Sequence, residues 1–205
     1  SNTISQTADT PLVLTSQNLN LYGNGAITLQ GLGSAGNELN SITVHSGTVG
    51  FNGDVFANAQ DYSGAASATV TGTVTLDADN AAGAINFTGT NLTGAGATLN
   101  VIVDAANTVT FAQVGAAGTE LAAVDVDTGI VAFTGDVFVN AQDYSGAASA
   151  TITGSRILDA DAASGAITFN GTALTRTAGT DTLTLRGQAA DTLTLGSVGA
   201  AGTEL

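Results

Sequence analysis

The feature that most constrains the fold is an internal repeat with an offset of 82 residues. Residues 53–72 and 135–154 are identical at all but two of twenty positions, and the same offset relates residues 82–90 to residues 164–172. A long repeat built from short strand-like segments is typical of a solenoid, in which each unit stacks on its neighbour and none buries its apolar face alone. The repeat therefore predicts an array of stacked units.

The repeat divides the chain into one partial unit and two full units. Residues 1–39 form the partial unit, residues 40–121 the first full unit and residues 122–205 the second. Both full units end in Gly-Thr-Glu-Leu. We expect the three parts to form one continuous solenoid, and further units to follow in a longer parent protein.

Apolar residues alternate with Thr, Asn, Ser or Gly over short stretches, which is typical of strands with one buried face. Turns that contain Gly or Asn stop each stretch after about 3–6 residues. The Ala-rich stretches 57–68 and 139–150 lack an apolar stripe at helical spacing and are predicted to be loops or short strands. The alternating positions are Ile27/Leu29, Ile42/Val44, Val49/Phe51, Val74/Leu76, Ile85/Phe87, Leu99/Val101/Val103, Val109/Phe111, Val124/Val126, Val131/Phe133, Ile167/Phe169, Leu183/Leu185 and Leu193/Leu195.

The density of these segments favours a parallel β-helix, an all-β fold. A β-sandwich has a turn every 8–12 residues or so, whereas about a dozen strand segments fit into one repeat unit. We expect three strands and about 20 residues per coil, hence about ten coils in a rod on the order of 50 Å long. The alternative is a pair of tandem β-sandwich domains, one for each full unit.

Charge and composition exclude several classes of function. The chain carries 17 acidic residues against three Arg, for a net charge of −14, and the acids are spread evenly over the units. Such a surface repels phosphate backbones, so we expect no nucleic-acid partner. No apolar run approaches the about 20 residues of a spanning helix, so we expect no membrane insertion. The absence of Cys excludes disulfides and Cys-ligated metals.

Residue types suited to catalysis are sparse. His45 is the only histidine, its counterpart one unit later is Asp127, and the chain has neither Cys nor Lys. The partners of a nucleophilic centre are therefore missing. We expect His45 to be an outward surface position, and the protein to have no catalytic residues and no enzymatic activity.

Two pairs of carboxylates are the candidates for a metal site. Asp77 and Asp79 of the first unit recur as Asp159 and Asp161 in the second. Aspartates at alternate positions before a Gly are similar to the start of a calcium loop, but Ala stands where a third oxygen ligand is needed. The pairs are therefore predicted to lie in solvated turns, with calcium as the alternative and no other cofactor. Paired carboxylates could also serve as acid and base in a glycosidase.

The segment Gln60-Asp61-Tyr62-Ser63-Gly64, repeated at 142–146, places an acid beside an aromatic ring in each unit. One interpretation is a ladder of ligand sites along the rod. The simpler one is a turn in which the Tyr covers the edge of the core and the Asp caps the turn.

The three Arg residues occur only in the second full unit, and we expect Arg156 to pair with nearby acids. Arg156, Arg176 and Arg186 replace Val74, Gly94 and Ile102 of the first unit.

Segments 74–90, 107–129 and 182–205 resemble the repeat regions of filamentous-haemagglutinin-like exoproteins and related giant bacterial adhesins. The shared pattern is an x-hydrophobic-Thr-hydrophobic-x-Gly strand followed by a Val-Gly-x-x-x-x-Leu turn, and it covers nearly the whole chain after about residue 19. The resemblance implies a right-handed parallel β-helix. It also implies export across a Gram-negative outer membrane, by a partner transporter or an autotransporter barrel, and a location on the cell surface or outside the cell.

We therefore expect a non-enzymatic structural or adhesive segment of a large bacterial surface protein that assembles end to end into fibres. The expected partners are copies of the chain, further repeat units, glycans, or a host or neighbouring cell surface. The alternatives are a carbohydrate-active β-helix of lyase or glycosidase type and a calcium-dependent adhesin extender. The ligand-binding residues stay unassigned.

Overall fold

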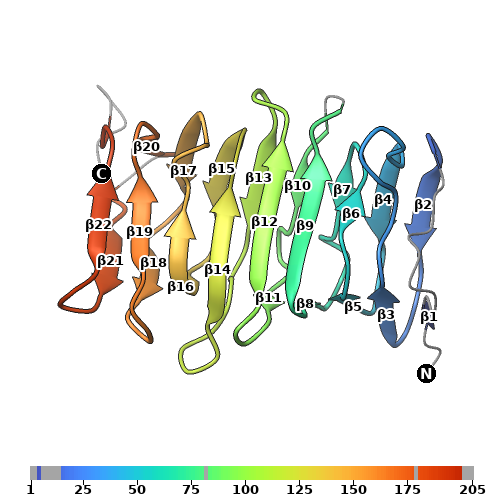
Figure 1. Cartoon of the computed structure of the whole chain (residues 1–205), viewed down its shortest axis with the longest axis horizontal. Coiled ribbons are helices and arrows are strands. Elements are labelled where there is room, and N and C mark those ends of the chain that lie inside the picture. The colour runs from blue at the N-terminus through green and yellow to red at the C-terminus, as the bar shows by residue number, and fades with distance from the viewer. Residues whose placement is uncertain (1–3, 6–14, 81–82, 178–179, 200–205) are drawn as a thin grey trace.

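All regular structure in the described part of the chain is β-strand, and the strands stack along one axis in about seven coils (Figure 1). The computed structural model describes residues 4–5, 15–80, 83–177 and 180–199. Every strand pair in these ranges is parallel. The predicted parallel β-helix is confirmed, and the tandem-sandwich alternative is wrong because a sandwich requires antiparallel pairs.

Each coil contributes strands to three faces. Face 1 contains β1 (Ile4–Ser5), β3 (Ala26–Leu29), β5 (Thr48–Phe51), β8 (Ser67–Val70), β11 (Leu92–Thr93), β18 (Arg156–Ala160) and β21 (Leu183–Gly187). Face 2 contains β2 (Asn18–Leu21), β4 (Ser41–Val44), β7 (Gln60–Asp61), β10 (Ile85–Asn86), β13 (Thr108–Phe111), β15 (Ile130–Phe133), β17 (Ser149–Ile152) and β20 (Ala173–Arg176). Face 3 contains β6 (Val55–Phe56), β9 (Thr73–Ala78), β12 (Thr98–Val103), β14 (Leu121–Val126), β19 (Ala166–Phe169) and β22 (Thr192–Leu195).

The seven-residue strand β16 (Val137–Asp143) turns the corner between two faces. Its first residue continues face 1, because Val137 pairs with Leu158 of β18. Its end continues face 3, because Gln142 pairs with Ile167 of β19. Isolated bridges from Leu92 to Val114 and from Val114 to Val137 complete face 1 between β11 and β16.

The strand registers give the length of a coil. Partner residues lie between 18 positions apart, as for Ile42 and Gln60, and 27 positions apart, as for Leu158 and Leu185, with about 24 as the usual spacing. The expected 20 is too small, because some turns are long: only the Val114 bridge interrupts residues 112–120 between β13 and β14. With strands about 4.8 Å apart, about seven coils make a rod on the order of 34 Å long rather than 50 Å.

The core is a stack of aliphatic side chains with a column of aromatic rings. Alternate residues of β9 and β12 are buried, as expected for strands with one inward face. In the column, neighbouring ring centroids lie 4.9–6.4 Å apart, within the range of favourable aromatic pairs. Its members are Phe51, Tyr62, Phe87, Phe111, Phe133, Tyr144 and Phe169.

The sequence repeat does not contain a whole number of coils. From β4 to its counterpart β14 the chain passes through the ten strands β4 to β13 and the Val114 bridge, which makes eleven strand positions. Because each coil uses three positions, the unit spans three coils and two further strands. β4 therefore lies on face 2 and β14 on face 3. In the same way, β5 and β15 occupy faces 1 and 2, and β9 and β18 occupy faces 3 and 1.

Equivalent segments keep their packing although they change face. Tyr62 lies 4.9 Å from both Phe51 and Phe87, measured between ring centroids. One unit later the corresponding distances are 5.1 and 4.9 Å, between Tyr144 and the rings of Phe133 and Phe169. Local sequence therefore determines how a strand packs, and the number of strands that precede it determines its face.

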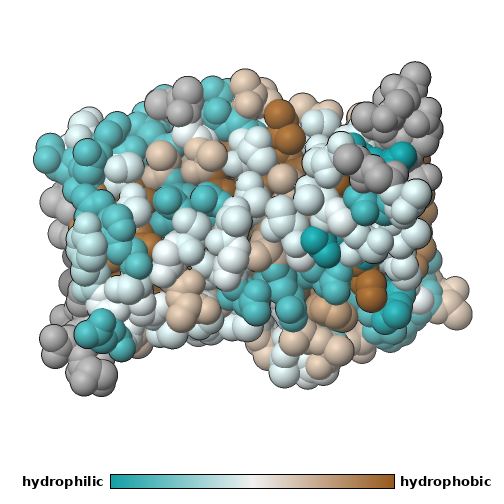
Figure 2. Space-filling view, turned by 180° about the vertical axis from the view of Figure 1, so that it is seen from behind, coloured by the Kyte–Doolittle hydropathy of each residue, from teal (hydrophilic) through white to brown (hydrophobic). Residues whose placement is uncertain are grey.

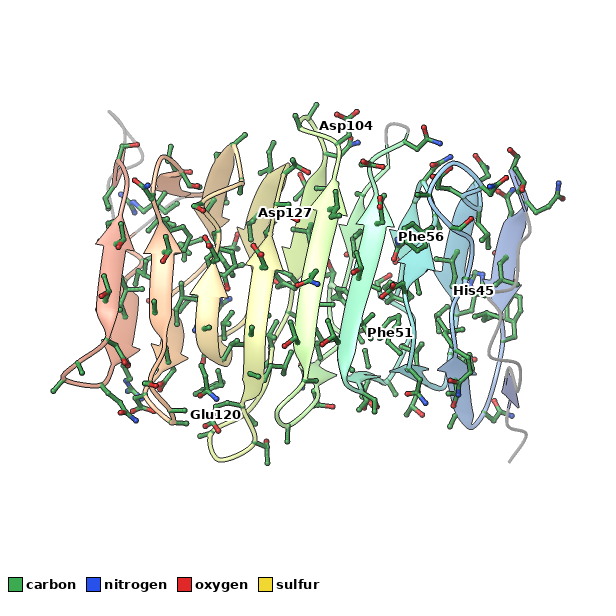
Figure 3. The ribbon with its side chains drawn as sticks, in the orientation of Figure 1. His45, Phe51, Phe56, Asp104, Glu120 and Asp127 are labelled. Carbon is green, nitrogen blue, oxygen red and sulfur yellow. The ribbon has the colours of Figure 1, made fainter. Side chains whose placement is uncertain are left out.

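The face seen in Figure 2 is a mixture of hydrophilic and neutral side chains with isolated apolar spots. Acidic loop residues lie at opposite edges of the rod, Asp104 at one and Glu120 at the other (Figure 3). None of the described segments forms a helix that is long and apolar enough to cross a membrane.

Candidate functional site

The first Asp pair lies at the end of β9. Asp77 is half-buried, and its carboxylate Oδ1 accepts a hydrogen bond from the backbone N–H of Asp79 at 3.2 Å. Asp79 itself is exposed. One carboxylate thus holds the backbone of the other residue in a turn, as the solvated-turn interpretation predicts.

A third carboxylate lies nearby and comes from a distant loop. Glu38, which is buried, accepts hydrogen bonds from the Gly36 backbone N–H at 2.5 Å and from the Asn80 side-chain amide at 2.7 Å. Desolvation acts to raise the pKa of the Glu38 carboxyl, but these bonds, together with one from its own backbone N–H, outweigh it and lower the pKa. Glu38 therefore anchors the turn after β9 to the loop before β4.

Asp77 is in an unfavourable place for a charge. Burial raises the pKa of Asp77 to about 6, and the negative charges of Asp79 and Glu38 add to the rise. On the neighbouring strand its register partner is Ile102, which offers no compensating charge.

The second Asp pair has the same turn but a different neighbour. Asp159 accepts the Asp161 backbone N–H at 3.0 Å and also pairs with Arg186, whose Nη1 lies 3.3 Å from Asp159 Oδ2. Arg186 is the register partner of Asp159 and the sequence counterpart of Ile102. The hydrogen bond with Asp159 and the negative charge of Asp159 raise the pKa of the Asp161 carboxyl. Identical Leu-Asp-Ala-Asp motifs thus have different charged neighbours: Glu38 lies near the first pair, and Arg186 lies beside the second.

We expect Ile102→Arg to lower the pKa of Asp77 by about 1–3 units, because it places a guanidinium where the second unit has Arg186. In the native protein the folded state binds the Asp77 proton more tightly than the unfolded state does, so this residue makes stability fall as pH rises from about 4 to about 6. The variant should lose that fall. The measurement is an NMR titration of the Asp77 carboxyl, with urea unfolding at several pH values.

Ile102→Gln is the matched control, since it introduces a polar chain of similar reach without a charge. It should leave the Asp77 titration within about half a unit of the native one. A pKa near the native value in Ile102→Arg would contradict the proposed electrostatic cause.

The two Asp pairs do not combine into one site. Asp77 and Asp79 belong to face 3, whereas Asp159 and Asp161 belong to face 1. An acid and a base from the two pairs therefore do not face each other, as a glycosidase built from them would require. Within the described ranges no group of three or more His, Cys, Asp or Glu residues is arranged to hold a metal ion.

Melting temperature should not depend on calcium, because the first carboxylate of each pair already accepts a backbone hydrogen bond and neither turn supplies six oxygen ligands. The measurement compares melting in millimolar calcium with melting in excess chelator. A calcium-dependent rise in melting temperature that Asp77→Asn abolishes would restore the calcium-dependent extender.

The repeated Gln-Asp-Tyr-Ser-Gly segment is partly a turn cap and partly core. The Asp61 carboxylate accepts the Ser63 backbone N–H at 3.0 Å, as predicted for a cap. Tyr62, however, lies in the core with no exposed surface, where its hydroxyl donates to Gln60 Oε1 at 2.9 Å. Gln60 in turn donates to the Asp77 carbonyl at 2.8 Å.

This buried polar group recurs in the second full unit, where the Tyr side chain again has no exposed surface. Gln142 and Tyr144 are buried in the same way, and Gln142 donates to the Asp159 carbonyl at 2.9 Å. The hydrogen bonds from Gln60 and Gln142 link these buried side chains to the backbone of Asp77 and Asp159, where the Asp turns begin. The sequence analysis assigned no role to Gln60 or Gln142. A signal was present, however: each Gln stands two positions before a Tyr, and a buried Tyr hydroxyl needs a hydrogen-bond partner.

His45 is exposed, as predicted for an outward position. Its ring stacks on Tyr22 with centroids 4.2 Å apart, and its Nε2 lies 3.2 Å from Asn20 Oδ1. Ser46 donates to the Gly23 carbonyl at 2.9 Å, so its hydroxyl is used within the turn.

The pairing expected for Arg156 is wrong. Its Nη1 donates to the backbone carbonyl of Ser155 at 2.9 Å, and among the described residues the arginine that forms an ion pair with an acid is Arg186. The register decides this, because Arg186 lies beside Asp159 whereas Arg156 lies beside Leu183.

Comparisons with known proteins give no family assignment: no family model matches the chain, and neither a curated protein nor a solved structure shows significant similarity to it.

Proposed function

We propose that this chain is a structural, non-enzymatic segment of a larger bacterial surface protein, in which stacked coils form a spacer or adhesive rod outside the cell. The observation that carries the proposal is the parallel ladder that continues through about seven coils around one filled core. Such a ladder extends by about 4.8 Å with every coil and has no inherent limit in length.

The use of the polar side chains also supports a structural role. The conspicuous acids Asp61, Asp77 and Asp159 each accept a backbone hydrogen bond inside their own turn. Acids spent in this way stabilise corners, while the net charge of −14 discourages lateral aggregation of rods. Export across a Gram-negative outer membrane belongs to the same proposal and is based on the repeat pattern.

Immunogold electron microscopy tests the location. Antibodies against the chain should label intact cells of the source bacterium, and protease treatment of intact cells should remove the label. Label that appears only after lysis would contradict an extracellular role.

A binding and activity screen tests the role itself. The purified chain should release neither reducing ends nor unsaturated sugars from any glycan in a panel of bacterial and host polysaccharides. Turnover of one glycan would replace the structural role by the carbohydrate-active alternative, whereas retention on a glycan or cell surface without turnover would identify an adhesin.

A further inference from the structure

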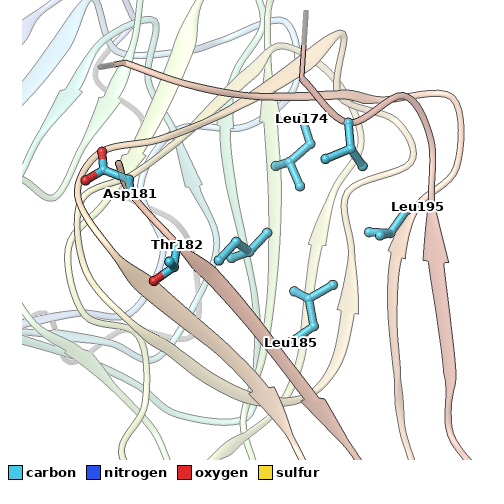
Figure 4. Close-up of a pocket in the computed structure, with 7 residues that line it drawn as sticks. Leu174, Asp181, Thr182, Leu185 and Leu195 are labelled. Atoms are coloured by element: carbon cyan, nitrogen blue, oxygen red, sulfur yellow. The ribbon is translucent and has the colours of Figure 1, made fainter. Parts of the chain in front are cut away.

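One end of the rod exposes side chains of a kind that lie in the core elsewhere. Leu193 and Leu195 of β22 are each 44% exposed, and the neighbouring Val198 is 47% exposed. Leu195 and Val198, with Leu174 and Leu185, line a hollow of about 300 Å³ (Figure 4). The lining of the hollow is mostly apolar.

The first full unit shows what covers the same surface inside the chain. The counterparts of Leu193, Leu195 and Val198 are Val109, Phe111 and Val114, which are 0%, 0% and 1% exposed. The next coil covers them in parallel register. The covering residues, in the same order, are Val131, Phe133 and Val137.

We propose that this end of the rod is a docking surface for the coil of a further repeat unit with the side-chain pattern of residues 121–137. The inference rests on the proposed role as one segment of a stacked rod, and it specifies the partner and the register. The docked coil places apolar residues opposite Leu193, Leu195 and Val198, as Val131, Phe133 and Val137 do inside the chain, and a parallel strand pairs with the open edge of β22.

The polar residues of the template coil do not oppose this docking. In the template coil Asp127 is exposed, and the half-buried Asp136 accepts the Ile157 backbone N–H at 2.9 Å. Asp125 alternates with the buried Val124 and Val126 of β14 and so takes an outward position. The residues that make the contact, Val131, Phe133 and Val137, are aliphatic or aromatic. Asp181 also lines the hollow, and its carboxylate accepts the Gly154 backbone N–H at 3.1 Å, so a partner that covers the hollow does not leave this acid without a hydrogen-bond donor.

A thiol-protection experiment tests the proposal on the full chain. Leu195→Cys should react rapidly with a maleimide in the 205-residue chain. It should react at least about tenfold more slowly when a second copy of residues 122–154 is fused after Leu205, because the fused coil would shield it. Phe111→Cys is the buried reference and should be protected in both chains.

The matched control carries the same fusion with the fused copies of Val131 and Phe133 changed to Asp, and should restore rapid labelling. Hydrogen exchange of the β22 amides in the chain with native Leu195 gives the same comparison without a core substitution. Equal rates with and without the intact fusion would overturn the proposal. Protection of the unextended chain that grows with its concentration would overturn it in favour of a second copy. Neither outcome depends on where immunogold locates the protein.

Discussion

Phe87→Ala should lower the free energy of unfolding by about 3–5 kcal/mol. The Phe87 ring is 1% exposed and lies between Tyr62, at 4.9 Å, and Phe111, at 6.3 Å between centroids. Truncation removes an interior ring of a continuous column, and the stacked backbone above and below cannot collapse into the space. Urea unfolding followed by circular dichroism measures the loss.

Phe56→Ala is the matched control, because this substitution removes the same atoms from a half-buried, outward position of β6. It should cost less than half as much as Phe87→Ala. Phe169→Ala removes the counterpart of Phe87 on another face and should cost a similar amount, since its ring lies 4.9 Å from Tyr144. A loss for Phe87→Ala no larger than that for Phe56→Ala would disprove the importance of the column.

Gly83→Ala should destabilise the protein by at least about 3 kcal/mol, the upper part of the usual range for overpacking. A Cβ added to Gly83 would lie 1.4 Å from the carbonyl oxygen of Asn58 in the coil below. Neither backbone can yield freely, because the Gln60 N–H donates to the Ala84 carbonyl at 2.9 Å across the same corner. Thermal and urea unfolding report the loss.

Gly50→Ala provides the comparison, because its added Cβ meets nothing closer than 3.9 Å and Gly50 lacks a positive φ. It should change stability by less than about 1 kcal/mol. Gly165→Ala, at the counterpart corner with Asn140 oxygen 1.6 Å away, should behave like Gly83→Ala. Equally small losses of stability for Gly83→Ala and Gly50→Ala would contradict this prediction, because they would show that the two backbones at the Gly83 corner can move apart.

The sequence predicts the strands and their parallel stacking well, because period-two alternation directly reports an inward face. All twelve alternating groups proposed from the sequence overlap strands, from Ile27/Leu29 in β3 to Leu193/Leu195 in β22. Strands β8 and β17 lie outside these twelve groups and begin at the ends of the Ala-rich stretches 57–68 and 139–150, which were predicted to be loops or short strands. Their alternation is weak because Ala68 and Ala150 face inward in place of a large apolar residue.

The coil length and the site were harder to predict, because both depend on register. Sequence spacing alone does not reveal that a turn holds nine residues or three, so the estimate of 20 residues per coil was too low. The same limit explains Arg186: its proximity to Asp159 follows from strand pairing 27 positions apart. Parts of the predicted repeat units at the two ends of the chain lie outside the described residues. They are residues 1–3 and 6–14 of unit 1–39, and residues 200–205 of unit 122–205.

The eleven strand positions of a repeat unit determine how a partner can contact consecutive units. Counterpart surface residues of consecutive units point in directions about 120° apart and are offset along the axis by about 18 Å, as three faces and 4.8 Å per coil require. A flat receptor can therefore contact only every third unit at one angle, whereas a ligand that binds consecutive units must spiral around the shaft. The rod therefore presents the same surface residues on each of its three faces in turn, although its sequence has no threefold repeat within a coil.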